Sequence, residues 1–297
     1  MEPEALTSSS PTTASVATAD SFRQELAANF FAYDEIRTMP QADQEALFLL
    51  LCKVQAGDTS LLQDIYKIVY DEVPVSMEEF VLGSRYLGLK NRIATTKLEI
   101  LMRFAHPSVR KMWCAAGSGS GKSFMVSVVQ AWMVYQLLCL KRPDFYYMLG
   151  PGSKIATVNL SVGKEQSKDV VFAEFVGRIS NSPWFGKKFV PQAGRCLFPK
   201  NIFALSGGSA ATSYFGYHTI MGSLDEASFM IDRQDRSMAE ELIEALTKSL
   251  STRFPNAYKL MVISTLRADD DFLYTNIDRI KKEGRALQLV DDPYAPA

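Results

Sequence analysis

The residues best suited to chemistry form one run, in which glycines and hydroxyls surround a single lysine. Its sequence is Ala116-Gly117-Ser118-Gly119-Ser120-Gly121-Lys122-Ser123. The run follows a predicted strand and opens a predicted helix, which is the context that a phosphate-binding loop requires. Glycines let backbone N–H groups turn toward phosphate oxygens, and the start of a helix adds partial positive charge. We predict that the phosphates of a nucleotide bind to Gly117, Ser118, Gly119, Ser120, Gly121, Lys122 and Ser123.

Two residues of this loop have individual roles. Lys122 would reach the β- and γ-phosphates and take part in catalysis, and Ser123 would be a ligand of Mg²⁺. The loop departs from the full motif at its first position, where Ala116 replaces glycine. A Gly/Ser-rich loop that binds nothing is the alternative, and the strand–loop–helix context favours phosphate binding.

A pair of carboxylates, Asp225 and Glu226, follows the predicted strand Thr219–Leu224. Transfer of a phosphoryl group to water needs one carboxylate that holds Mg²⁺ and a second that orients or deprotonates the water. We assign the metal role to Asp225 and the role of catalytic base to Glu226. Such a pair alone would usually be solvated surface, and its position after the phosphate loop favours the catalytic interpretation.

A third element is an apolar strand that ends in two hydroxyls, Ser264 and Thr265. One of them could sense the γ-phosphate and couple hydrolysis to movement. The alternative is a strand whose Ser/Thr end simply leads into the acidic loop Asp269–Asp271.

Composition argues against several other kinds of site. The cysteines form no CxxC pair, which argues against a zinc site or a disulfide framework; they are Cys52, Cys114, Cys139 and Cys196. With only two histidines, His106 and His218, a histidine-based metal site is nearly excluded. There is no run of about 18 uncharged apolar residues to predict a membrane span, and the N-terminus does not resemble a signal peptide. The net charge is −1, with a basic excess in residues 81–200 that would suit a polyanion.

From about Arg110 onward, strand and helix patterns alternate, which predicts an open α/β sheet whose ligands bind at the carboxyl ends of the strands. Predicted helices are Ser123–Leu140, Lys164–Ile179, Ser237–Arg253 and Asp271–Glu283. Predicted strands are Lys111–Ala116, Phe145–Leu149, Ile155–Val162, Arg195–Phe198, Ile202–Leu205, Thr219–Leu224 and Lys259–Thr265, with Ala286–Val290 extended. The expected fold class is α/β, a P-loop NTPase of the ASCE type with a mainly parallel central sheet flanked by helices.

We expect four parts along the chain. Residues 1–20, rich in Ser, Thr and Ala, form a disordered tail. Residues 21–109 form a helical N-terminal region with helices at Ala42–Val54 and Ser60–Tyr70. Residues 110–285 form the P-loop ATPase core, and residues 286–297 begin a linker.

With these motifs in this order, residues 77–290 resemble the large terminase subunit of tailed bacteriophages. Met77-Glu78-Glu79-Phe80 with Tyr86-Leu87-Gly88-Leu89 resembles the segment before that family's ATPase core, and Asn159–Phe185 resembles the stretch between its two nucleotide motifs. Ser223-Leu224-Asp225-Glu226-Ala227 resembles its Walker B segment. Val262-Ile263-Ser264-Thr265 resembles its coupling motif.

The resemblance implies an ATPase motor that translocates double-stranded DNA into a procapsid, with ATP and Mg²⁺ as cofactors. It implies a homo-oligomeric ring, expected to be a pentamer, that works with the portal protein and the small terminase subunit and has no membrane partner. The expected location is the host cytoplasm, at the portal vertex of the procapsid. A C-terminal nuclease domain is expected to be missing after Ala297, so we expect no DNA cleavage by this chain.

Several positions depart from the family pattern. Ser118 stands where many terminases have an arginine in the loop, Lys97 where an adenine-contacting glutamine is common, and Phe215 near the place of a trans-acting arginine. The arginine that stabilises the transition state is left open among Arg142, Arg178, Arg195 and Arg233. Two other functions stay open as well, a helicase-like DNA translocase and an assembly protein with a degenerate nucleotide site.

Overall fold

A computed structural model describes residues 40–55, 58, 66–162, 171–208, 216–230, 238–265 and 272–282. The chain divides by compactness into two units, Met1–Ile68 and Val69–Ala297. In the first unit, helix α3 spans Gln41–Gln55, which confirms the helix predicted at Ala42–Val54. The predicted tail 1–20, the extended segment Ala286–Val290 and most of the predicted helix Ser60–Tyr70 lie outside the described residues.

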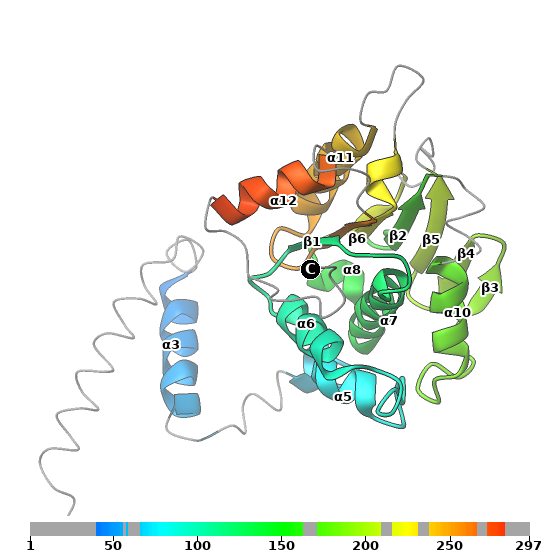
Figure 1. Cartoon of the computed structure of the whole chain (residues 1–297). Coiled ribbons are helices and arrows are strands. Elements are labelled where there is room, and N and C mark those ends of the chain that lie inside the picture. The colour runs from blue at the N-terminus through cyan, green and yellow to red at the C-terminus, as the bar shows by residue number, and fades with distance from the viewer. Residues whose placement is uncertain are drawn as a thin grey trace, which may run out of the picture. The chain divides into compact units, whose positions relative to one another are not determined.

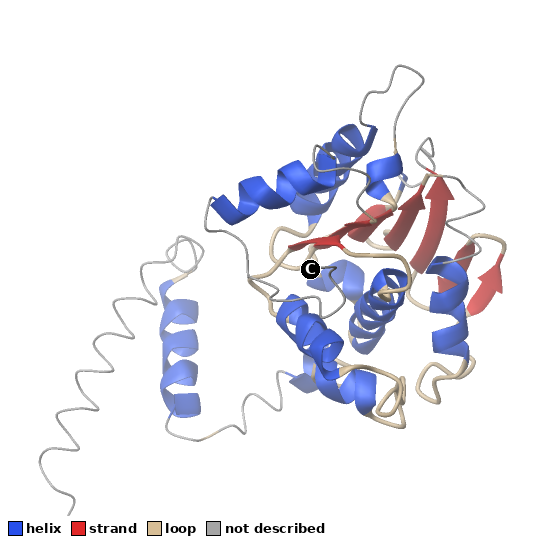
Figure 2. Ribbon diagram, in the orientation of Figure 1, coloured by secondary structure: helices blue, strands red, loops and turns tan. Residues whose placement is uncertain are grey.

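The second unit is built on one sheet with the strand order β1-β7-β6-β2-β5-β4-β3 (Figures 1 and 2). Its strands are β1 (Lys111–Ala115), β2 (Ile155–Ser161), β3 (Val190–Gln192), β4 (Arg195–Phe198), β5 (Ile202–Gly208), β6 (His218–Asp225) and β7 (Lys259–Ser264). Neighbours from β1 to β5 run parallel, and β4 and β3 are antiparallel additions at one edge. The mainly parallel sheet predicted from the sequence is therefore confirmed.

Helices cover both faces of this sheet (Figure 1). One face is covered by α7 (Lys122–Cys139), with α10 (Ala173–Ser180) packed beside it, and α11 (Met238–Arg253) packs against β6 on the other. Strands covered on both faces are shielded from solvent along their whole length. All residues of β2 and β7 are accordingly buried. The last described helix is α12 (Phe272–Lys282).

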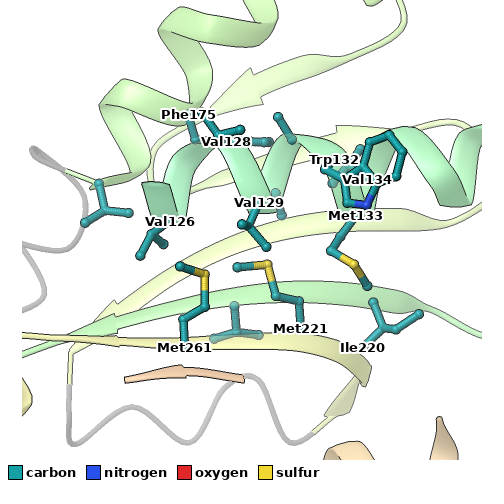
Figure 3. Packing of buried hydrophobic residues seen from close by; sticks show 14 of the residues in the cluster. Val126, Val128, Val129, Trp132, Met133, Val134, Phe175, Ile220, Met221 and Met261 are labelled. Atoms are coloured by element: carbon teal, nitrogen blue, oxygen red, sulfur yellow. The ribbon is translucent and has the colours of Figure 1, made fainter. Parts of the chain in front are cut away.

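The core lies between α7 and the sheet. Figure 3 shows Val126 and Val129 of α7 facing the side chains of Met221 and Met261, which come from β6 and β7. Val128 lies instead toward Phe175 of α10, so a single helix packs against two partners. Each such side chain contributes about 1.5–3 kcal/mol when it is fully buried. This packing fixes the start of α7, and with it the phosphate loop.

Two helices before the sheet pack against α7: α5 (Met77–Leu82) and α6 (Thr95–Ala105). Ser76 caps α5, since its hydroxyl accepts from Glu79 N at 3.2 Å. Both helices belong to the same compact unit as the sheet. The sequence had assigned them to a helical region that ends at residue 109.

One predicted strand is wrong. In the segment Phe145–Leu149, the chain forms the short helix α8 (Pro143–Tyr146) and a turn. Pro143 stands at the first helical turn, where proline has the φ that a helix needs and gives up an N–H that would have no partner. The carboxylate of Asp144 accepts from Phe145 N at 2.9 Å and adds a local bond that the apolar pattern does not reveal.

The remaining predictions in the core differ only in extent. The predicted helix Lys164–Ile179 corresponds to α10, and its first part lies outside the described residues. Strand β3 was not predicted, because its short sequence Val190-Pro191-Gln192 is exposed at the sheet edge. Across the residues that the structure describes, none of the helices has both the length and the apolar character needed to cross a membrane.

Candidate nucleotide-binding site

The three motifs predicted from the sequence meet at the carboxyl edge of the sheet. Strand β7 lies between β1, which leads into the loop, and β6, which ends at Asp225. Ala115 pairs with Ser264, and Asp225 pairs with Ile263. The intervening strand is the arrangement of the ASCE type of P-loop NTPase. It brings residues far apart in sequence to one end of three neighbouring strands, where ligands of such sheets bind.

The loop itself needs two of its glycines for conformational reasons. Gly119 has φ +78° and Gly121 has φ +87°, values that L-residues with a side chain rarely adopt. Gly121 is the N-cap of α7, and the helix begins at Lys122. Gly117, Ser118 and Gly119 are exposed, so their backbone is open to a ligand.

The ammonium group of Lys122 is buried at the base of the loop. Its Nζ donates to Ala116 O at 2.7 Å, to Gly117 O at 3.0 Å and to Thr265 Oγ1 at 3.1 Å. The loop lysine thereby contacts the end of β7 directly. Ser123, the next residue, lies half-buried in the first turn of α7.

The Glu226 carboxylate is held at the end of β7 by hydrogen bonds from Ser264 and Thr265. Its Oε2 accepts from Thr265 N at 3.1 Å and from Ser264 Oγ at 3.1 Å. Its backbone has φ +54° and ψ +45°, the left-handed conformation that costs a residue with a side chain about 1–2 kcal/mol. This strained conformation accompanies the carboxylate's position beside β7, and strained residues of this kind cluster at functional sites.

Asp225 occupies the buried position of the pair. It is 4% exposed, and its Oδ1 has no hydrogen-bond partner among the described residues. Burial, together with the nearby charge of Glu226, raises the pKa of this carboxyl to about 6. A buried carboxylate oxygen without a partner is costly unless a ligand supplies one. The oxygen chemistry of Asp225 and Ser123 fits Mg²⁺, which prefers carboxylate, hydroxyl and water ligands.

A buried polar network behind the site was not predicted from the sequence. Gln130 of α7 donates to Thr157 Oγ1 at 3.0 Å and accepts from Asn159 Nδ2 at 2.6 Å, and Ser223 Oγ donates to Asn159 Oδ1. All four residues are buried. The network ties the helix after the loop to β2 and to β6, the strand that ends at Asp225. A glutamine inside the apolar helix pattern was the one signal available beforehand.

Ser161 is a second residue that sequence reasoning missed. It is the last residue of β2, fully buried, and its hydroxyl has no partner within the described part of the chain. Leu160 pairs with Leu224 of β6, so Ser161 follows at the strand end beside Asp225.

Of the arginines left open, Arg178 contacts the first turns of the helix that follows the loop. It donates to Ser127 Oγ at 2.6 Å and to Glu174 Oε2 at 2.8 Å, and it lies 4.0 Å from the centre of the Phe124 ring. These contacts attach α10 to the first turns of α7.

The other three arginines are not brought to the site by the described structure. Arg142 pairs with Asp144 beyond the far end of α7, and Arg195 donates to Gln192 at the sheet edge. Arg233 lies outside the described residues, as does Phe215.

The fold and the loop geometry together define a P-loop NTPase domain. The family described as "Uncharacterized protein MJ0330, N-terminal P-loop domain" matches residues 35–288, and the chain belongs to this family. Membership confirms the predicted α/β P-loop fold. Comparison with curated proteins found no match.

Among solved structures, the chain is similar to the large terminase of bacteriophage HK97. The two share 18% sequence identity with a TM-score of 0.47, over 65% of this chain and 37% of that chain. The present chain thus corresponds to little more than a third of that terminase's length.

Proposed function

We propose that this chain is the ATPase motor subunit of a viral terminase, which translocates double-stranded DNA into a procapsid. The observation that carries the hydrolytic part is the contact chain from Lys122 through Thr265 to Glu226. Lys122 Nζ lies 3.1 Å from Thr265 Oγ1, and Thr265 N donates to Glu226 at 3.1 Å. If Lys122 moves when the γ-phosphate binds, Thr265 would transmit that movement to the Glu226 carboxylate.

Each site residue then has a distinct task. Loop N–H groups and Lys122 bind the phosphates, while Ser123 and Asp225 hold the Mg²⁺ that neutralises phosphate charge. Glu226 orients the attacking water and accepts its proton. Ser264 and Thr265 donate hydrogen bonds to the Glu226 carboxylate, and in this proposal they couple hydrolysis to movement of β7.

The DNA-packaging part of the proposal rests on the sequence resemblance of residues 77–290 to large terminases. The basic excess of residues 81–200 supports contact with a DNA backbone, because Lys and Arg that neutralise phosphates supply most non-specific affinity. We propose the portal protein, the small terminase subunit and further copies of this chain in a five-membered ring as partners. The corresponding location is the host cytoplasm, at the procapsid portal vertex.

Hydrolysis of ATP with Mg²⁺, measured with and without double-stranded DNA, tests this proposal. Glu226→Gln should lower turnover by about 10²–10⁴-fold, because it removes the base, while leaving ATP binding intact. Glu240→Gln on the exposed face of α11 is the matched control and should behave as wild type. DNA should stimulate the wild type.

The possible outcomes separate the parts of the proposal. ATP hydrolysis without any response to DNA would leave an ATPase and reject the packaging motor. A wild type that neither binds nor hydrolyses ATP would reject the enzyme altogether and favour an assembly protein with a degenerate site.

A further inference from the structure

We propose that Lys97 is a second phosphate-contacting cation of this site, supplied by helix α6 rather than by the loop. The inference rests on the proposed nucleotide binding and adds to it a residue outside the recognised motif. It also gives a role to a lysine at a position where the sequence resemblance implied an adenine-contacting glutamine.

The ammonium group of Lys97 lies directly against the phosphate loop. A Cβ built on Gly121 would stand 2.6 Å from Lys97 Nζ and 3.2 Å from its Cε. Gly121 is the N-cap of α7 and immediately precedes Lys122. Glycine is therefore required here for its positive φ, and a side chain at this position would also displace the end of Lys97.

The electrostatics of this placement favour an anion. Lys97 is in the first turn of α6, which has no acidic residue, and its charge reaches the start of α7. Both helix starts carry partial positive charge, so a cation is unfavourable at either one. Lys97 is half-buried and has neither an ion-pair nor a hydrogen-bond partner in the described residues. A polyphosphate bound at the loop would supply the missing counter-charge.

Helix α6 is held firmly enough to keep Lys97 in place. Leu101 and Phe104 of α6 are buried. At the C-terminal end of the helix, Lys259 of β7 donates to Phe104 O at 2.7 Å and to His106 O at 2.9 Å. The same strand ends at Ser264, whose hydroxyl donates to Glu226, so β7 contacts both the helix that carries Lys97 and the Glu226 carboxylate.

The chemistry of an ammonium group points to phosphate rather than to adenine. Lysine offers three donors and no acceptor, whereas the edge of adenine presents both donors and acceptors. A glutamine amide can match that pattern and a lysine cannot. Lys97 should therefore contribute to affinity for any nucleoside triphosphate and contribute nothing to selectivity among bases.

Equilibrium binding of MgATP, MgGTP and magnesium tripolyphosphate tests the inference. Lys97→Met, which removes the charge without introducing an amide, should weaken all three by the same factor, about tenfold for a lost charge-assisted hydrogen bond. Lys97→Arg should retain most of the affinity. Arg103→Gln removes a charge from an exposed position of the same helix and should leave binding unchanged. Melting temperatures of Lys97→Met and Arg103→Gln that stay close to or above that of the wild type show that the fold is intact.

Three other results would overturn the inference. Loss confined to MgATP would make Lys97 an adenine contact. Wild-type affinities in Lys97→Met, with binding abolished in Lys122→Ala, would reject the role of Lys97 and leave the proposed function standing. Absence of binding in the wild type would reject both together.

Discussion

The two ends of helix α7 differ in how their polar groups are satisfied. Beyond the C-terminal end, Lys200 Nζ donates to Asp71 Oδ2 at 2.8 Å and to Leu138 O at 2.7 Å. At the N-terminal end, Lys97 and the Oδ1 of Asp225 have no partner among the residues that the structure describes. Native structures leave few buried polar groups unpaired, so unpaired groups at one end mark a place for a ligand. One helix thus joins a structural end to a candidate binding end.

The structural end also carries an aromatic cluster, defined here as Phe80, Trp132, Tyr135 and Trp184. The Phe80 ring centre lies 4.8 Å from that of Tyr135 and 5.2 Å from that of Trp132, and Tyr135 lies 4.7 Å from Trp184. Aromatic pairs at these distances add about 0.5–1.5 kcal/mol beyond burial of their area. The cluster joins α5 to α7 and to the segment after α10.

The largest expected effect on stability comes from breaking this cluster. Phe80 is fully buried, so Phe80→Ala should lower the free energy of unfolding by about 3–5 kcal/mol through lost transfer energy and a residual cavity. Denaturant unfolding measures this change. Phe145→Ala, at a side chain that is 78% exposed, is the control and should change stability by no more than about 0.5 kcal/mol. A loss below about 1 kcal/mol in Phe80→Ala would contradict the packing described for this end.

At the candidate binding end, removal of a buried charge should raise the free energy of unfolding instead of lowering it. The Asp225 carboxyl has a pKa raised from 3.8 to about 6, chiefly by burial. The folded state therefore holds its proton more tightly than the unfolded state, and stability falls as pH rises from about 4 to about 6. Above pH 7 the cost is complete, about 3 kcal/mol at 1.36 kcal/mol for each pH unit.

Asp225→Asn should therefore stabilise the nucleotide-free protein while abolishing hydrolysis. We expect a gain of about 1–3 kcal/mol at pH 8 that mostly disappears at pH 4, because wild-type Asp225 is then protonated in the folded state. Urea unfolding at both pH values measures the difference, with Glu240→Gln on the exposed face of α11 as the control. An equal gain at both pH values would show that burial of the charge is not the cause.

The same contrast explains which features could be predicted from the sequence. The phosphate loop could be predicted because its glycines, lysine and serine lie in one continuous run. The hydrogen bonds of Glu226 with Ser264 and Thr265 could not be predicted. They depend on β7 lying between β1 and β6, and the local sequence pattern of a strand does not reveal which strands are its neighbours. Lys97 stood out only as a departure from a family pattern, since its place on Gly121 requires the packing of α6 on α7. The strand predicted at Phe145–Leu149 was wrong because Pro143 and Asp144 favour a short helix at this place in the chain.

The smallest expected effect on stability comes from the backbone of Glu226. It distinguishes the cost of the left-handed backbone conformation from the loss of the side chain. Both Glu226→Ala and Glu226→Gly lose the hydrogen bonds to Ser264 and Thr265 N, and both should be inactive in hydrolysis. Alanine must still adopt φ +54°, whereas glycine adopts it freely. Glu226→Gly should therefore be more stable than Glu226→Ala by about 1 kcal/mol in thermal or urea unfolding. An alanine variant as stable as the glycine variant would show that the loop relaxes once the carboxylate is gone, and that the contacts with β7 are what impose the left-handed conformation.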